Sequence, residues 1–259
     1  MNVFYVLIFL QVLLESFPIS SSGHLKLFDF FCLNFKKLNI SDLLPKDFDH
    51  FLHGPTILVL VLFFYKRCVF MVLNIFKLYK ILFKMLVLLF IADAVTAFFY
   101  LFRDFAIFKL PLWCGFLITA LLLFSLKFCN PKQLKIFNVS KAVYLGLAQA
   151  VALLLPGVSR FGITYVVARW LSLPAKKSFE LSFAIEMPLI TAGFLKGLVY
   201  LLKSDSIFIL FDPIFWFVTL FASVFSYFGF WFMYWLALQK KFWLVSIYMI
   251  IPIVISLIF

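Results

Sequence analysis

Residues 11–24 read QVLLESFPISSSGH, and residues 149–164 read QAVALLLPGVSRFGIT. In each stretch an apolar segment runs into a proline and a group of small polar residues, and a second apolar segment follows. Proline ends a helix because it lacks a backbone N–H and clashes with the preceding turn. Both stretches therefore predict a helix, a polar break and a second helix, and they decide how the rest of the chain is arranged.

The composition around these breaks is that of a membrane protein. Of 259 residues, 66% are hydrophobic, 21% aromatic and only 13% charged, whereas soluble chains have roughly 45–50% apolar and about 25% charged residues. Six apolar runs are long enough, or nearly so, to cross a hydrocarbon core of about 30 Å as helices. They occupy residues 51–65, 85–102, 110–126, 181–202, 213–238 and 242–259. We predict an all-α integral membrane protein with about six transmembrane helices and two re-entrant hairpins, at 1–33 and 139–172.

The two hairpins also match each other in sequence. Gln11, Pro18 and Ser21 recur with the same spacing as Gln149, Pro156 and Ser159. Such a match is expected of an internal repeat. We predict a single membrane domain, residues 1–259, built from one repeat at 1–126 and a second at 127–259.

Basic residues set the orientation of these repeats. Lysine and arginine cluster at residues 66–84 and 127–141, which predicts two cytoplasmic loops under the positive-inside rule. The first hairpin then enters from outside and the second from the cytoplasm, so the repeats are inverted. Inverted repeats with broken helices bring their breaks together near the membrane midplane. One polar cavity is therefore expected between residues 11–24 and 149–164.

Other classes of protein are disfavoured. The net charge of +12 comes from cations lying between apolar runs, which argues against nucleic acid as a partner. The four cysteines have no C-x-x-C spacing, so neither a disulfide framework nor a zinc site is indicated. Residues 1–14 lack the basic region and cleavage site of a signal peptide, and we expect them to stay in the mature protein.

The first break offers a nucleophile and groups to activate it. Gln11 and Glu15 lie four residues apart and would share one helix face, where a carboxylate within an apolar segment indicates function. They could instead only bind water. If a helix begins near Ser20, then Ser21 and His24 lie on one side and can meet, so that the imidazole activates the hydroxyl. An N-cap serine with a hydrogen-bonded structural histidine explains the same spacing equally well.

The second break has the composition of an anion site. Gly157 permits close backbone approach, and Ser159, Arg160 and Thr164 add hydroxyls and a guanidinium at a helix start. Free N–H groups at a helix N-terminus and an arginine both bind phosphate oxygens. Arg160 could alternatively pair with Glu15 as a structural bridge.

Together these groups favour phosphoryl transfer from a lipid phosphate. Catalysis of this reaction consists mostly of positioning and of neutralising oxyanion charge. Ser21 would attack, although His24 or Glu15 could activate a water instead. The rival interpretation is a polyprenyl-phosphate flippase or small anion transporter, since such proteins share this architecture but need no nucleophile.

Both motifs resemble those of the undecaprenyl-diphosphate phosphatase family associated with bacitracin resistance. The resemblance rests on Gln11-x-x-x-Glu15 with Pro18 to His24, and on Pro156 to Arg160 with Thr164. It extends to Phe48-Asp49, to Glu180 to Phe183, to Pro188 and to the general length, so it covers nearly the whole chain. Phe161 departs from the pattern, because the family usually has a second serine there. Gln11 stands where either Glu or Gln is found.

The resemblance implies an enzyme of the bacterial plasma (inner) membrane that removes one phosphate from undecaprenyl diphosphate. The product is the lipid carrier for peptidoglycan and other surface polymers, and the site would be reached from the outer leaflet. By motif position, Glu15, Ser21, His24 and Arg160 take catalytic roles. Six residues would bind substrate: Gln11, Ser20, Ser22, Gly157, Ser159 and Thr164. A divalent cation, Mg²⁺ or Ca²⁺, is implied and would be held mainly by Glu15 and the substrate phosphates. Whether the protein forms a homodimer is left open.

Overall fold

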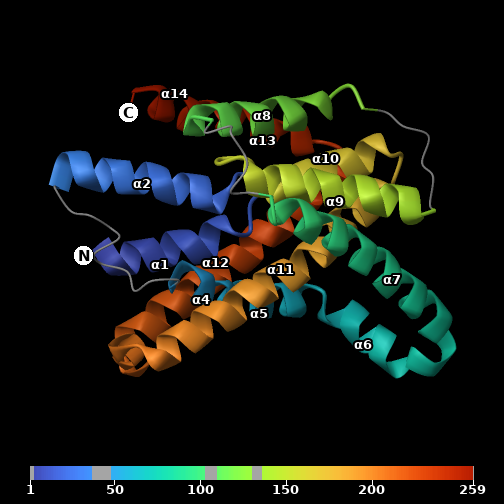
Figure 1. The fold of residues 1–259 in the computed structure, drawn as a ribbon, viewed down its shortest axis with the longest axis horizontal. Coiled ribbons are helices and arrows are strands. Elements are labelled where there is room, and N and C mark those ends of the chain that lie inside the picture. The colour runs from blue at the N-terminus through green and yellow to red at the C-terminus, as the bar shows by residue number, and fades with distance from the viewer. Residues whose placement is uncertain (1–2, 37–47, 103–109, 130–135, 259) are drawn as a thin grey trace.

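The computed structural model describes residues 3–36, 48–102, 110–129 and 136–258, and this part of the chain is helical without strands (Figure 1). The all-α prediction is confirmed there. The helices of the first half are α1 (Val3–Leu14), α2 (Ser21–Lys36), α4 (Phe48–Phe51), α5 (His53–Phe63), α6 (Tyr65–Leu73), α7 (Ile75–Tyr100) and α8 (Leu112–Ser125). Those of the second half are α9 (Val139–Leu154), α10 (Arg160–Trp170), α11 (Ala175–Lys203), η2 (Asp205–Phe211), α12 (Pro213–Leu238), η3 (Phe242–Leu244), α13 (Val245–Tyr248) and α14 (Ile250–Ile258).

Three of these helices, α7, α11 and α12, are long and apolar enough to cross a membrane. A fourth span results if α4 to α6 count as one segment, which is bent by 67°. The predicted runs at 110–126 and 242–259 correspond to shorter apolar helices, and the last is divided into η3, α13 and α14. The described part of the chain is thus a multi-pass arrangement of apolar helices.

The prediction of a loop at residues 66–84 is wrong. These residues form α6 and the first turns of α7, which project together from the rest of the molecule (Figure 1). No proline or glycine interrupts residues 65–100. Lys77, Lys80 and Lys84 follow the helical spacing and are exposed along one side of α7. Lysines can cover apolar surface with their stems while the ammonium reaches water, so the positive charge does not exclude a helix.

Both predicted breaks are present. α1 ends at Leu14 and α2 begins at Ser21. Between them Ser20 has a φ of 65°, and its hydroxyl accepts a hydrogen bond from the Gly23 N–H at 3.3 Å. α9 ends at Leu154, and Ser159 caps α10 by accepting a hydrogen bond from the Gly162 N–H at 3.0 Å. Serine caps thus restart both helices, as expected for a small side chain that satisfies a free backbone N–H.

Helix α8 fixes the second break in place. Gly157 has a φ of 83°, a conformation that favours glycine. Gly115 of α8 lies against the Pro156 carbonyl, so closely that a larger residue would collide with it. The Thr119 hydroxyl of α8 accepts a hydrogen bond from the Ser159 N–H at 3.0 Å. Because α8 supplies both contacts, the polar backbone of this break is satisfied inside the protein.

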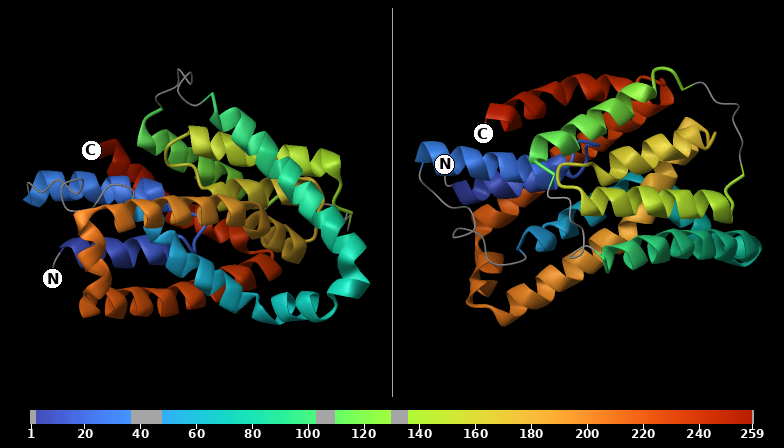
Figure 2. Two further views of the ribbon diagram at one scale, coloured as in Figure 1. Left: turned by 60° about the horizontal axis from the view of Figure 1, so that its bottom comes forward. Right: turned by 45° about the horizontal axis from the view of Figure 1, so that its top comes forward.

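The two broken hairpins are surrounded by the longer helices. α1 packs against α12, α9 packs between α7 and α10, and α10 also contacts α11. On the far side α8 runs beside α14 (Figures 1 and 2). A phenylalanine-rich core joins α10 to α11 and α12, with Phe161 stacked on Phe183 at a ring-centroid distance of 4.1 Å. The breaks therefore lie within the packed part of the molecule.

Candidate active site

A polar cavity of about 560 Å³ lies where the two breaks meet. Its wall is made by residues of both breaks, by α4 and α5, and by α11. The polar and charged lining residues are Gln11, Glu15, Ser20, Ser21, Ser22, Lys26, Asp49, His50, His53, Ser159, Arg160 and Glu186. The expectation that residues 11–24 and 149–164 face one cavity agrees with this geometry.

Arg160 joins the two breaks electrostatically. Its Nη2 lies 3.0 Å from Glu15 Oε1, and its Nε lies 3.3 Å from Glu186 Oε1. Both carboxylates are nearly buried, with side-chain exposures of 6% and 11%, whereas the guanidinium side chain is 21% exposed. The bridge from Arg160 to Glu15 that the sequence allowed is therefore present. Since Arg160 also lines the cavity, the same guanidinium can face an anion there.

Ser21 is the first residue of α2; it lines the cavity and interacts with the Glu15 carboxylate. The other carboxylate oxygen, Glu15 Oε2, is buried without a hydrogen-bond partner among the described residues, and so is Gln11 Oε1. A hydroxyl beside an ionised carboxylate can pass its proton to it when it attacks an electrophile. The cavity thus places a hydroxyl next to a carboxylate.

His24 occupies a different position from the one that the Ser21 pairing required. Its Nδ1 lies 2.9 Å from the Ser20 carbonyl oxygen and its Nε2 lies 3.2 Å from the Tyr248 hydroxyl. The ring stacks on the Tyr248 ring and lies edge-on to Phe116. The imidazole is not among the groups that line the cavity in the described part of the chain. This is the second alternative, an N-cap serine with a hydrogen-bonded histidine.

The remaining predicted residues divide into two groups. Ser20, Ser22 and Ser159 line the cavity with Gln11. Thr164 does not: its hydroxyl donates to the Arg160 and Phe161 carbonyls of its own helix. Gly157 likewise lies behind the cavity wall, where its backbone packs on the Leu112 carbonyl of α8. Neither residue therefore lines the cavity, and their contact with substrate stays a prediction.

Five polar or charged residues of the cavity lie outside the predicted site: Lys26, Asp49, His50, His53 and Glu186. Two of them contact Glu15 or Arg160. His53, at the start of α5, lies with Nδ1 3.5 Å from Glu15 Oε1. Glu186, in the middle of α11, bonds Arg160 as described above. Neither belongs to a break, and only the positions of polar residues within apolar spans could have indicated them. Gln149, which matches Gln11 in the predicted repeat, makes hydrogen bonds between helices instead. It accepts one from the Thr96 hydroxyl and donates one to the Ile185 carbonyl.

The carboxylates of the cavity are groups of the kind that bind a divalent cation. Within the described ranges no group of three or more His, Cys, Asp or Glu is arranged to hold a metal ion by itself. The wall nevertheless carries three carboxylates, Glu15, Asp49 and Glu186, against two cations, Lys26 and Arg160. The unpartnered oxygens of Glu15 and Gln11 are hard acceptors of the kind that Mg²⁺ and Ca²⁺ prefer. A cation shared with phosphate oxygens would fit them.

Fold and site together define a helical, multi-pass membrane protein with a polar cavity between its two helix breaks. The chain belongs to the family of the bacitracin resistance protein BacA, which matches residues 5–255. It is 31% identical over 232 residues to an undecaprenyl-diphosphatase of Borrelia recurrentis, with 82% of each chain covered. It is 34% identical over 211 residues to an undecaprenyl-diphosphatase of Treponema denticola, with 75% of each chain covered. It is also 34% identical over 200 residues to an undecaprenyl-diphosphatase of Thermosipho africanus, with 74% of this chain and 76% of the relative covered.

Proposed function

We propose that the protein hydrolyses undecaprenyl diphosphate to undecaprenyl phosphate and inorganic phosphate. Membership of the BacA family and the names of the relatives support a hydrolase acting on a phosphoric anhydride. The observation that carries the proposal is the convergence of Ser21 and Glu15 from one break with Arg160 from the other in a single cavity. A flippase would bind the diphosphate but would have no need of an activated hydroxyl.

Attack by Ser21 is the step that this geometry supports. Its oxygen bonds to the terminal phosphorus, the bond from that phosphorus to the bridging oxygen breaks, and undecaprenyl phosphate leaves. The serine proton passes to Glu15, with which Ser21 interacts. A water then releases the phosphoryl group as inorganic phosphate and restores the serine. Arg160, Ser159 and the start of α10 stabilise the negative charge that develops on the phosphoryl oxygens.

His24 acts in this scheme by holding the start of α2 rather than as the base. Its bonds to the Ser20 carbonyl and the Tyr248 hydroxyl fix the turn that presents Ser21. His53 holds Glu15 on the opposite side. A side chain that is kept in one rotamer by such contacts needs no reorganisation when the reaction occurs.

A divalent cation would be held by Glu15 Oε2 and Gln11 Oε1 together with phosphate oxygens. When bound, it neutralises charge on the diphosphate. Two observations support this proposal: carboxylates already surround Arg160, and a diphosphate would add further negative charge to the same cavity.

The proposed arrangement in the membrane follows the sequence pattern. We propose six spans and two re-entrant hairpins, α1–α2 and α9–α10, belonging to inverted repeats at residues 1–126 and 127–259. The site would open toward the outer leaflet of the bacterial inner membrane, where the released carrier serves peptidoglycan synthesis. The lengths of the first helices support the two re-entrant hairpins. α1 has 12 residues and α9 has 16, whereas a helix that crosses the whole membrane needs about 20.

The test is phosphate release from undecaprenyl diphosphate by the purified protein in detergent. We expect release with Mg²⁺ or Ca²⁺, no release with EDTA, and a loss of at least about 100-fold in Ser21→Ala. Ser256→Ala, in α14 and outside the cavity, is the matched control and should retain activity. Folded wild-type protein that releases no phosphate but moves the lipid across vesicle membranes would replace the phosphatase with the flippase.

A further inference from the structure

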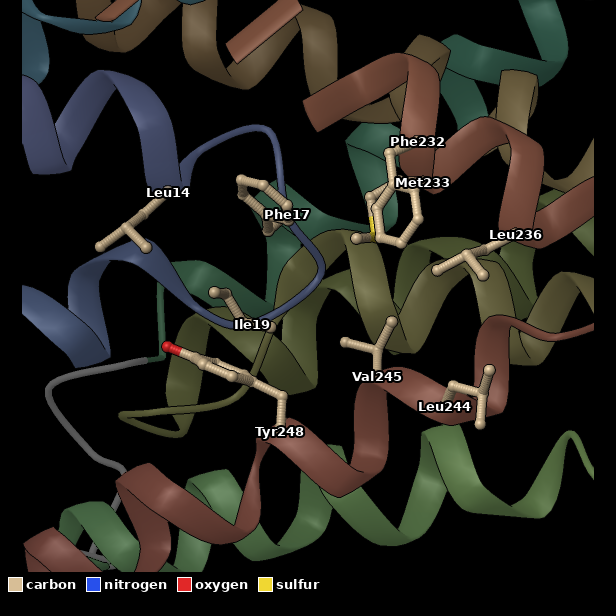
Figure 3. A pocket seen from close by; sticks show the side chains of 9 residues that line it. All are labelled: Leu14, Phe17, Ile19, Phe232, Met233, Leu236, Leu244, Val245 and Tyr248. Atoms are coloured by element: carbon tan, nitrogen blue, oxygen red, sulfur yellow. The ribbon is translucent and has the colours of Figure 1, made fainter. Parts of the chain in front are cut away.

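Two largely apolar cavities in the described part of the chain differ in charge. The smaller, about 440 Å³ in volume, lies behind the first break (Figure 3). Among the nine residues that line it there is no lysine or arginine, and the Tyr248 hydroxyl is their one polar side-chain group. The larger, about 840 Å³, is a groove between α5, α6, α7 and α11 that shares no lining residue with the polar cavity of the candidate active site. Charged side chains of α6 and α11 line this groove in addition to its apolar residues.

The charges of the groove gather where α6 and α11 begin. Arg67 of α6 forms an ion pair with Glu180 of α11, which joins the first turns of the two helices. Lys176 and Lys177 lie about one turn before Glu180 and also line the groove. Lys141, at the start of α9, interacts electrostatically with Lys177. One carboxylate thus stands among four cations, and this end of the groove carries a net positive charge.

The rest of the groove is apolar and leads away from these charges. From Lys177 to Met187, α11 rises by about 15 Å, and Leu181, Phe183, Ala184 and Met187 form its side of the wall. Four apolar residues of α7 form another side. α6 has no buried residue and projects with α7 from the rest of the molecule, so the groove is open to the surroundings of the protein (Figure 1). The groove therefore offers a cationic end and an apolar length to one amphipathic ligand.

We propose that this groove binds an anionic phospholipid of the membrane. The lipid phosphate lies beside Arg67, Lys176 and Lys177, and an acyl chain lies along α7 and α11. Basic pockets between membrane helices bind anionic head groups in this way. A guanidinium has five N–H donors, and the Arg67 side chain is 47% exposed, so it has donors for a phosphate besides those that bond Glu180. The site is separate from the polar cavity, and the inference does not depend on the proposed function.

The first experiment measures lipid binding to the detergent-purified protein by native mass spectrometry. The probes are phosphatidylglycerol and phosphatidylcholine with identical acyl chains, which differ in net charge. Lys176→Gln with Lys177→Gln removes two charges from the groove. Lys240→Gln with Lys241→Gln removes two charges from the turn after α12 and is the matched control, because neither residue lines the groove.

We expect the wild type to bind phosphatidylglycerol at least about tenfold more tightly than phosphatidylcholine, a difference of about 1.4 kcal/mol. The groove variant should lose this preference, whereas the control variant should keep it. Equal affinity of the wild type for both lipids, or an unchanged preference in the groove variant, would overturn the proposal. A dimer that forms without bound lipid would assign the groove to a second copy of the chain instead.

A second readout locates the lipid. Phosphatidylglycerol with a diazirine in its acyl chain should label the peptides that contain Met85 and Met187, which line the groove. Excess phosphatidylglycerol should displace this label, and excess phosphatidylcholine should not. Ala184→Phe narrows the groove and should reduce the label, while labelling of Met233 in the smaller cavity should stay the same. Label that is stronger at Met233 than at Met85, or that undecaprenyl phosphate displaces at lower concentration than phosphatidylglycerol does, would contradict a site for anionic phospholipid.

Discussion

Arg160→Ala removes the partner of two buried carboxylates at once. Glu15 loses a contact of 3.0 Å and Glu186 one of 3.3 Å, and the two negative charges then face each other across the cavity. Removing one partner of a buried ion pair costs about 3–5 kcal/mol. Since the Arg160 side chain is 21% exposed, water relieves part of this cost, and we expect about 3 kcal/mol of destabilisation. The lost contact to the phosphoryl oxygens should lower kcat by about 10²–10³.

Two assays on the same protein preparation separate these effects. Thermal unfolding in detergent should show Arg160→Ala melting well below the wild type, and adding Glu186→Gln to it should recover part of the difference. Phosphate release should remain low in both variants, because neutralising Glu186 does not restore the guanidinium. An Arg160→Ala protein that melts like the wild type and keeps more than about a tenth of its kcat would refute this reasoning.

Three further predictions follow from individual contacts. His24→Ala should lower kcat only about tenfold, less than the 10²–10⁴ expected for a general base; a loss as large as that of Ser21→Ala would make His24 the base after all. His53→Ala frees Glu15 on one side and should reduce kcat several-fold with little change in KM, as measured by steady-state phosphate release. Gly157→Ala forces a side chain into a φ of 83° and against the Leu112 carbonyl at 2.8 Å, so it should destabilise the protein by about 2 kcal/mol in thermal unfolding, and an unchanged melting temperature would contradict this.

The parts of the fold that depend on local chemistry could be predicted from the sequence. Pro18 and Pro156 predict the two breaks. The following helices begin where expected, next to Ser20 and Ser159, whose hydroxyls accept hydrogen bonds from backbone N–H groups. The segment 66–84 could not be predicted correctly from charge. Its lysines are compatible with both a loop and an exposed helix, and the absence of helix-breaking residues outweighed the charge pattern.

The site was predictable only as far as residues within the breaks are concerned. Glu15, Ser21 and Arg160 meet because residues of both breaks line one cavity. The orientation of His24 depends on Tyr248, which is distant in the sequence and reaches it through the packing of α13. Similarly, Glu186 and His53 enter the site from α11 and α5, and helix spacing gives no information on which face of a long apolar helix turns toward a hairpin. Thr164 lies within the predicted segment, but its hydroxyl donates a hydrogen bond to the Arg160 carbonyl of the same helix instead of facing the cavity.

The most direct test of the account is to trap the phosphoryl group on the enzyme. Wild-type protein would be mixed with undecaprenyl diphosphate labelled in its terminal phosphate and quenched in acid within the first turnover. The account predicts label on the peptide that contains Ser21, appearing before free phosphate and absent from Ser21→Ala. Turnover by the wild type without any labelled serine, together with phosphate release by Ser21→Ala at the wild-type rate, would contradict it.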